Sequence, residues 1–155
     1  MGAARAQVRR VRDGQLGKGD AVPHLIVTGH GTLAKALLAS AEMILDGLPD
    51  NVLALDMTAD NNLASMRNAA CAATAETDTG VLVLADLLGG TPANAAAWAA
   101  EQREIVVVCG VNLPMLLEVL VNLPHKTLPE LVELAVAQGR DGIRRLEMGR
   151  GKHDG

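Results

Sequence analysis

The sequence predicts an α/β domain with a doubly wound, mainly parallel sheet and helices on both faces. Short uninterrupted apolar runs alternate with longer segments whose apolar residues recur at helical spacing. The apolar runs are flanked by glycine, proline or aspartate, as is common for strands that are buried on both faces. Such alternation builds right-handed βαβ units, and we expect four strands in the order 2-1-3-4.

The first half of the chain is expected to contain two strands, each followed by a helix. The run HLIVT predicts a strand at residues 24–28, and helical spacing predicts a helix at 32–46 that ends at Gly47. A second strand at 51–57 and a second helix at 60–76 follow. The expected buried face of the first helix consists of Leu33, Ala36, Leu37, Ser40 and Ile44, and that of the second helix of Leu63, Met66, Ala70 and Ala73.

The second half repeats the pattern. The run GVLVLAD, residues 80–86, is the clearest strand, and a fourth strand is expected at 104–110. Between them a helix should run to Glu101, with Thr91 as its N-cap and proline at its first position. The remaining helices are expected at 113–122 and 128–138, and the glycine at position 139 should end the last one.

We expect the domain to occupy residues 22–148. Residues 1–21 lack a sustained apolar period and predict a flexible extension, with a short basic helix as the alternative. Residues 149–155 predict a disordered tail. Residues 142–148 are too few to form a stable strand alone, so we expect an antiparallel strand at a sheet edge, in this chain or in a partner.

Composition excludes several classes of protein. Aromatic residues make up 1% of the chain, which argues against proteins that bind RNA or single-stranded DNA by stacking. The net charge is −4, which disfavours a nucleic-acid partner or an anionic membrane surface. Cys71 and Cys109 form no CxxC and no Cys/His cluster, so we expect no metal site. Neither a Walker loop nor a GxGxxG fingerprint is present, and we expect no cofactor.

Polar residues and glycines gather where three of the predicted strands end. They form GHG at 29–31, DLLGGTPAN at 86–94 and GVNLPM at 110–115. In the order 2-1-3-4 these strand ends are neighbours, and doubly wound sheets bind ligands there. The second strand contributes Asp56, to which the sequence assigns no role.

His30 is the candidate nucleophile of this edge. An imidazole between a strand end and a helix start can attack phosphorus, and backbone amides and the helix dipole can hold the anionic product. Asp86 can fix the ring tautomer and leave the other ring nitrogen free. The alternative is a loop histidine and a turn aspartate without chemical function.

A glycine-rich loop that leads into a helix N-terminus favours an anion site. The expected phosphate-binding residues are Gly31, Gly89, Gly90 and Thr91. For Thr91 two tasks remain open, that of N-cap, which we favour, and that of phosphate ligand.

The motifs GHG, DLLGGTPANAAA and GVNLPMLLE, with the closing LVELAVAQGRDGIRRL, resemble the IIA component of the mannose/fructose/sorbose family of the bacterial sugar phosphotransferase system. The resemblance runs from about His24 to Leu146. It implies a cytoplasmic phosphocarrier at a membrane transporter, which takes a phosphoryl group from HPr and passes it to a IIB component. The membrane components IIC and IID then import the sugar. His30 would carry the phosphoryl group beside Asp86 and Thr91.

The same resemblance implies a homodimer that exchanges the C-terminal strand, and a site wall formed by Asn112, Leu113, Pro114 and Met115. Ala93 stands where the family commonly has an aromatic residue. We expect this difference to alter the partner-docking surface rather than the chemistry. Three alternatives remain: a regulatory phosphoprotein of this fold, a dihydroxyacetone-kinase-type phosphotransfer subunit, and a flavodoxin-like small-molecule binding domain. The GGTP and NLPM elements favour the sugar branch.

Overall fold

Four parallel strands form one sheet in the computed structural model, which describes residues 21–75, 77–101 and 103–147. The strand order is β2-β1-β3-β4, and every neighbouring pair is parallel. This confirms the predicted order and direction. The strands are β1 (His24–His30), β2 (Val52–Met57), β3 (Val81–Ala85) and β4 (Ile105–Cys109).

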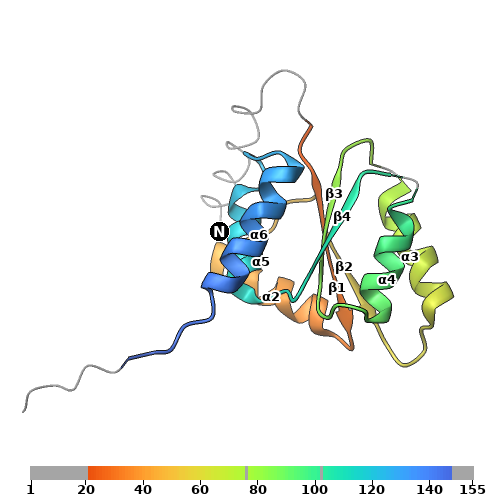
Figure 1. The fold of residues 1–155 in the computed structure, drawn as a ribbon, viewed down its shortest axis with the longest axis horizontal. Coiled ribbons are helices and arrows are strands. Elements are labelled where there is room, and N and C mark those ends of the chain that lie inside the picture. Colours follow the sequence, from red (N-terminus) through yellow and green to blue (C-terminus); the bar gives the residue numbers. More distant parts are fainter. Residues whose placement is uncertain (1–20, 76, 102, 148–155) are drawn as a thin grey trace, which may run out of the picture.

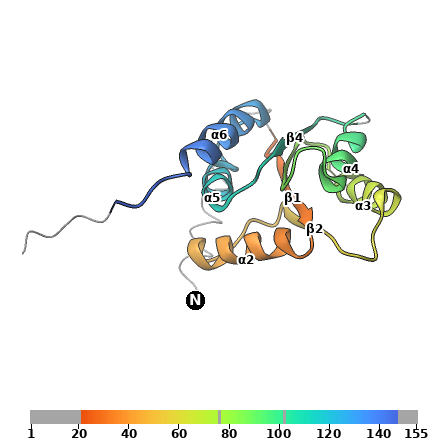
Figure 2. The ribbon, with the colours of Figure 1, turned by 60° about the horizontal axis from the view of Figure 1, so that its bottom comes forward.

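Helices cover both faces of this sheet. One layer contains α2, α5 and α6 and the other contains α3 and α4, with the sheet between them (Figure 1, and in a second view Figure 2). None of the helices among the described residues is long and apolar enough to cross a membrane. The helices are α2 (Leu33–Leu45), α3 (Leu63–Ala75), α4 (Thr91–Ala99), α5 (Leu113–Asn122) and α6 (Leu128–Asp141).

Successive residues of each central strand enter opposite cores, which is why these strands carry apolar residues without alternation. All five residues of β3 are buried. Leu82 and Leu84 lie in the larger core below α2, α5 and α6, whereas Val81 and Val83 lie in the smaller core below α3 and α4. The parallel strands all end at one edge of the sheet, and β1 brings His30 there as its last residue. The predicted strand at residues 24–28 was therefore two residues too short at its C-terminal end.

The buried face of α2 differs from the predicted one. Ala34, Leu38 and Ala41 are buried, whereas Leu33 is 41% and Ile44 54% exposed. Leucine, alanine, methionine and isoleucine occur almost all around this helix, so periodicity alone does not single out one face. Packing against the sheet and α5 decides the rotation.

Gly139 does not end α6, which continues to Asp141. A β-carbon at position 139 would collide with the Met115 side chain of α5. The glycine therefore serves close packing between two helices and is not a helix terminator.

Residues 142–147, the described part of the predicted C-terminal strand, belong to no strand in the single chain. Ile143 and Leu146 are 80% and 82% exposed. Exchange of this segment with a second chain remains a prediction. The expectations for residues 1–20 and 149–155 lie outside the described residues.

Candidate functional site

The site is built on the ends of the two central strands. His30 closes β1, and Asp86 directly follows β3. Asp86 Oδ2 accepts a hydrogen bond from the backbone N–H of His30 at 2.8 Å and lies 2.7 Å from His30 Nδ1. The two residues are 56 positions apart in the chain, and the parallel β1–β3 pairing brings them together, as expected.

The carboxylate fixes the chemistry of the imidazole. An ionised carboxylate only accepts hydrogen bonds, so Nδ1 must carry the ring hydrogen that it shares with Asp86 Oδ2. The neutral ring then presents its lone pair at Nε2. The histidine side chain is 49% exposed and that of Asp86 13%, so the ring is accessible from solvent while the residue that orients it is shielded.

Asp86 is ionised at neutral pH. Burial alone raises the pKa of this carboxyl group. The hydrogen bonds from the backbone and ring of His30, with the positive charge of the ring when it is protonated, outweigh burial and lower the pKa below its ordinary value of 3.8. The carboxylate is therefore present as the acceptor that the tautomer argument requires.

Two glycines leave room for this pair. A β-carbon at Gly90 would lie 2.9 Å from His30 Cε1, and one at Gly29 would lie 3.2 Å from Asp86 Oδ2. A methyl group at Gly90 would force the exposed ring to shift, and one at Gly29 would require the Asp86 carboxylate to give by a few tenths of an ångström. The glycine of the GGTP motif thus packs directly against the imidazole ring.

Helix α4 begins beside the ring. Its N-cap is Gly90 and its first residue is Thr91, so the prediction of Thr91 as N-cap was wrong. The Asn94 side chain donates to the carbonyl of Gly89 at 3.1 Å and holds the glycine loop onto the helix that it precedes. This role of Asn94 was not predicted from the sequence, although an asparagine one turn into a helix is a usual partner for the preceding loop.

The backbone amides at this edge divide into two groups. Gly31 donates its N–H to Met57 at 2.8 Å, and Gly90 donates to Leu87 at 3.2 Å. These two expected phosphate ligands therefore have their amides engaged within the protein. The first-turn amides of Thr91 and Ala93 have no intrahelical partner, since only Asn94 reaches back to the Gly90 carbonyl.

The residues predicted as a site wall join two helices. Asn112 caps α5 by accepting from the Met115 N–H at 3.0 Å and donates from Nδ2 to the Gly139 carbonyl of α6 at 2.9 Å. Met115 is 3% exposed, and Pro114 packs near Gly142. Both ends of the Asn112 amide are thus used between α5 and α6. Leu113, the first residue of α5, is partly buried against the larger core.

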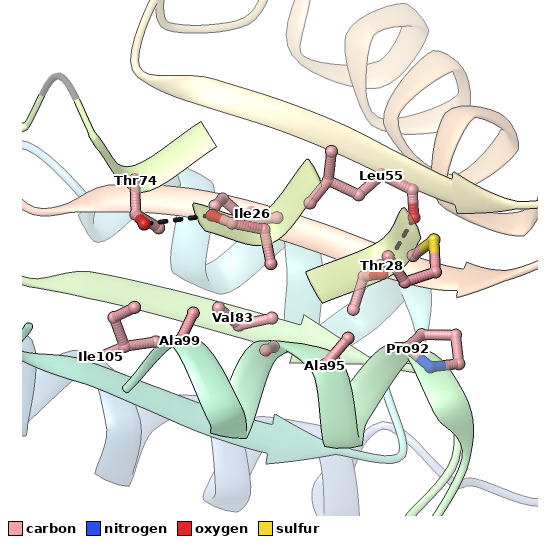
Figure 3. A pocket seen from close by; sticks show the side chains of 12 residues that line it. Ile26, Thr28, Leu55, Thr74, Val83, Pro92, Ala95, Ala99 and Ile105 are labelled. Carbon is pink, nitrogen blue, oxygen red and sulfur yellow. Dashed lines mark hydrogen bonds between the residues drawn. The ribbon is translucent and has the colours of Figure 1, made fainter. Parts of the chain in front are cut away.

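Small side chains let α4 lie close to the sheet. In Figure 3 the methyl groups of Ala95 and Ala99 point from α4 toward the strands that carry Ile26 and Val83. An apolar space of about 10 Å³ remains between α4, α3 and the sheet, little more than one water-sized sphere. Because Pro92 is also fully buried, the start of α4 is fixed at the strand ends.

One cysteine lies near the site. Cys109 pairs in register with Ala85 at the end of β3, and burial, followed by the charge of Asp86, raises the pKa of its thiol. The thiol therefore stays protonated at neutral pH. Within the described ranges no three His, Cys, Asp or Glu side chains are grouped so that they could hold a metal ion.

Fold and site together define a doubly wound α/β domain that presents one carboxylate-oriented histidine at the carboxyl edge of its sheet. Comparison with known proteins identifies the family. The model of the EIIA-man family, described as the PTS system fructose IIA component, matches residues 24–136. The chain belongs to this family of phosphotransferase-system components, which confirms the resemblance.

Curated relatives support the assignment. The chain is 39% identical over 127 residues to the mannose-specific EIIAB component of Escherichia coli K12, covering 79% of this chain and 39% of the relative. It thus spans about two fifths of that protein. The fructose-specific EIIA component of Bacillus subtilis is 36% identical over 123 residues, with 77% of this chain and 84% of the relative covered.

Solved structures share the fold. The mannose/sorbose-specific IIA subunit from Enterococcus faecalis superimposes with a TM-score of 0.76 at 32% identity, covering 83% of this chain and 97% of that chain. The EIIA component from Streptococcus agalactiae gives a TM-score of 0.74 at 28% identity and covers 79% and 95%.

Proposed function

We propose that the chain is a cytoplasmic phosphocarrier of a sugar phosphotransferase system and that His30 is its phosphorylated residue. The observation that carries the proposal is the double hydrogen bond to Asp86 Oδ2, which orders the His30 ring and leaves Nε2 free. Membership in the phosphotransferase-system family supports it.

The transfer moves one phosphoryl group between two imidazoles. His30 Nε2 attacks the phosphorus of a phosphohistidine on HPr, so a new N–P bond forms while the donor's N–P bond breaks. The leaving imidazole of HPr retains the electron pair of that bond. Asp86 stabilises the positive charge that develops on the His30 ring through Nδ1. In the next step the same exchange passes the group to a histidine of a IIB component.

The start of α4 provides the donors for the phosphoryl oxygens. We assign this task to the N–H groups of Thr91 and Ala93 and to the Thr91 hydroxyl, because the amides of Gly31 and Gly90 are engaged elsewhere. The positive end of the α4 dipole adds to the attraction.

The surface around His30 suits protein partners. Leu33, Leu87 and Leu88 are 41%, 60% and 83% exposed at this edge, and exposed apolar side chains beside a reactive group favour transient docking of another protein. We propose HPr as donor and a IIB component as acceptor, which serves membrane components IIC and IID. Ala93 is 5% exposed and so contributes its amide, whereas its side chain adds little to the docking surface.

Intact-mass analysis tests the proposal. The chain is incubated with phosphoenolpyruvate, enzyme I and HPr, and we expect the gain of one phosphoryl group that is labile in acid and stable in alkali. His30→Ala should abolish the gain. His125→Ala is the matched control, because His125 is an exposed loop residue, and it should retain the gain. A phosphorylated His30→Ala protein would show that another residue is the acceptor.

A further inference from the structure

Asp56 is a buried carboxylate at the same edge of the sheet as His30. The proposed phosphoryl transfer assigns it no role. Asp56 lies near the end of β2, in register with Gly29, and its side chain is 4% exposed. Its Oδ1 accepts a hydrogen bond from the backbone N–H of Lys35 at 3.2 Å. Its Oδ2 is buried and, within the described part of the chain, accepts no hydrogen bond.

A buried carboxylate with one unsatisfied oxygen is costly. The ion pair with Lys35 Nζ at 3.6 Å compensates it only weakly, because the lysine side chain is 72% exposed. A side chain at such a position needs a structural role that an apolar side chain could not fill.

Helix α2 supplies the reason. Its N-cap, Thr32, forms no side-chain capping hydrogen bond, and its first turn contains no acidic residue. Asp56 therefore provides, from the neighbouring strand, the carboxylate acceptor that the helix lacks in its own sequence. The Lys35 N–H that it accepts is the third of the helix.

The same stretch of β2 is also hydrogen-bonded to the segment that connects His30 to α2. The Met57 carbonyl accepts the Gly31 N–H at 2.8 Å, and Gly31 has a φ of 63°, a left-handed conformation that favours glycine. Only Gly31 and Thr32 separate His30 from α2. The position of His30 thus depends on Asp86, which follows β3, and on Asp56 and Met57 at the end of β2.

We propose that Asp56 is a positioning residue for phosphoryl transfer, which caps α2 from β2 and thereby holds the His30 ring against the start of α4. The proposal rests on the proposed function for its kinetic consequence. It also has a structural consequence in the unphosphorylated protein, namely that the orientation of the His30 ring depends on Asp56.

Three variants separate the contributions. Asp56→Ala removes the cap and the charge, Asp56→Asn keeps an oxygen that can accept the Lys35 N–H, and Lys35→Met removes only the ammonium group. The control is Glu130→Ala, because Glu130 accepts the Thr127 N–H at 2.8 Å at the start of α6. That helix start packs beside Gly80, at the opposite end of the sheet from His30.

The experiment measures the rate of phosphoryl acceptance from phospho-HPr, the amide hydrogen exchange of Lys35 and Gly31, and the ¹⁵N shifts of the His30 ring. We expect Asp56→Ala to slow acceptance about 10-fold or more, to accelerate exchange at both amides and to shift the ring signals. Asp56→Asn should retain most of the wild-type rate of acceptance. Lys35→Met and Glu130→Ala should behave like the wild type.

Two results would overturn the proposal. One is a folded Asp56→Ala protein with wild-type ring shifts and wild-type rate, which would make Asp56 a helix cap without influence on His30. The other is an equal loss of rate in Glu130→Ala or Lys35→Met. If the wild type accepts no phosphoryl group at all, the proposed function fails, while the exchange and ring-shift measurements still decide the role of Asp56.

Discussion

A single oxygen atom, Asp86 Oδ2, accepts hydrogen bonds from both the backbone N–H and the ring of His30, at 2.8 and 2.7 Å. The backbone bond fixes the strand end relative to the carboxylate, and the ring bond fixes the imidazole relative to the strand end. Orientation and tautomer of the histidine are therefore set by one side chain.

Asp86→Asn should slow phosphoryl acceptance without abolishing it. Nucleophile and helix amides remain, whereas control of the tautomer and stabilisation of the charged ring are lost, for which about a 10- to 100-fold loss is expected by analogy with other histidine-orienting carboxylates. Single-turnover rates with phospho-HPr measure the effect, and ring ¹⁵N shifts should show a mixture of tautomers. A wild-type rate in this variant would reduce Asp86 to a turn cap.

The sequence predicted this pair because parallel strands place their carboxyl ends at one edge, so GHG and DLLGG had to be neighbours once the order 2-1-3-4 was inferred. Packing details were not accessible in the same way. The buried face of α2 depends on the sheet below it, and position 139 within α6 is a glycine because the Met115 side chain occupies the space that a β-carbon would need.

Asp56 shows the same limit at the site. In the sequence it is one aspartate at the end of a strand, and its contact with Lys35 exists only through the β1–β2 pairing and the path of α2. Thr91 was predicted as N-cap because threonine is favoured there, but the glycine before it has the extended backbone of the cap.

Acid should weaken the contribution of Asp86 to stability. Its folded-state pKa lies below the ordinary value of 3.8, so the carboxylate stabilises the fold fully at pH values above about 3.8, and this contribution is lost as pH falls through the folded-state pKa. The wild type should therefore lose stability more steeply than Asp86→Asn below pH 3.8. Urea unfolding at several pH values measures how the free energy of unfolding changes with pH in each protein. An equal pH dependence in both proteins would contradict a lowered pKa for Asp86.

Gly90→Ala should disturb the site more than the fold. The backbone of Gly90, at φ −70° and ψ 158°, is accessible to alanine, but the new methyl group would lie 2.9 Å from His30 Cε1. The exposed ring has space to move away, and such displacement can cost up to about 100-fold in transfer rate. The melting temperature of this variant should stay near that of the wild type, while its transfer rate should fall. A rate equal to that of the wild type would show that the ring needs no contact with the glycine loop.

Ala95→Leu should displace α4 from the sheet. Ala95 is fully buried beside a space that fits about one water-sized sphere, so overpacking is expected to cost about 1–3 kcal/mol of unfolding free energy. Ala97→Leu, at an exposed position of the same helix, is the matched control. Trp98 lies on α4 within 5.2 Å of the Arg67 guanidinium, and its fluorescence should change only in Ala95→Leu. Equal stability of both variants would show that the small core tolerates a larger side chain.

The last prediction concerns assembly. β4 lies at an edge of the sheet, and its five residues, Ile105–Cys109, contain no charged side chain, which leaves an edge suited to pairing. Residues 143–147 expose Ile143 and Leu146 and belong to no strand in the single chain. We expect this segment to pair with the sheet of a second copy and to form a homodimer by strand exchange, a low-cost route to two-fold symmetry.

Truncation after Gly142 removes the exchanged segment and keeps α6, whose last turn packs on α5; truncation after Gly139, within the helix, would not separate the two effects. Light scattering should give a dimer for the full chain and a monomer or an aggregating species for the truncated chain. The double variant I143D/L146D should likewise dissociate, because two carboxylates would replace the apolar side chains at the interface. A monomeric full chain would exclude the dimer, and a truncated chain that remains a dimer would place the interface elsewhere.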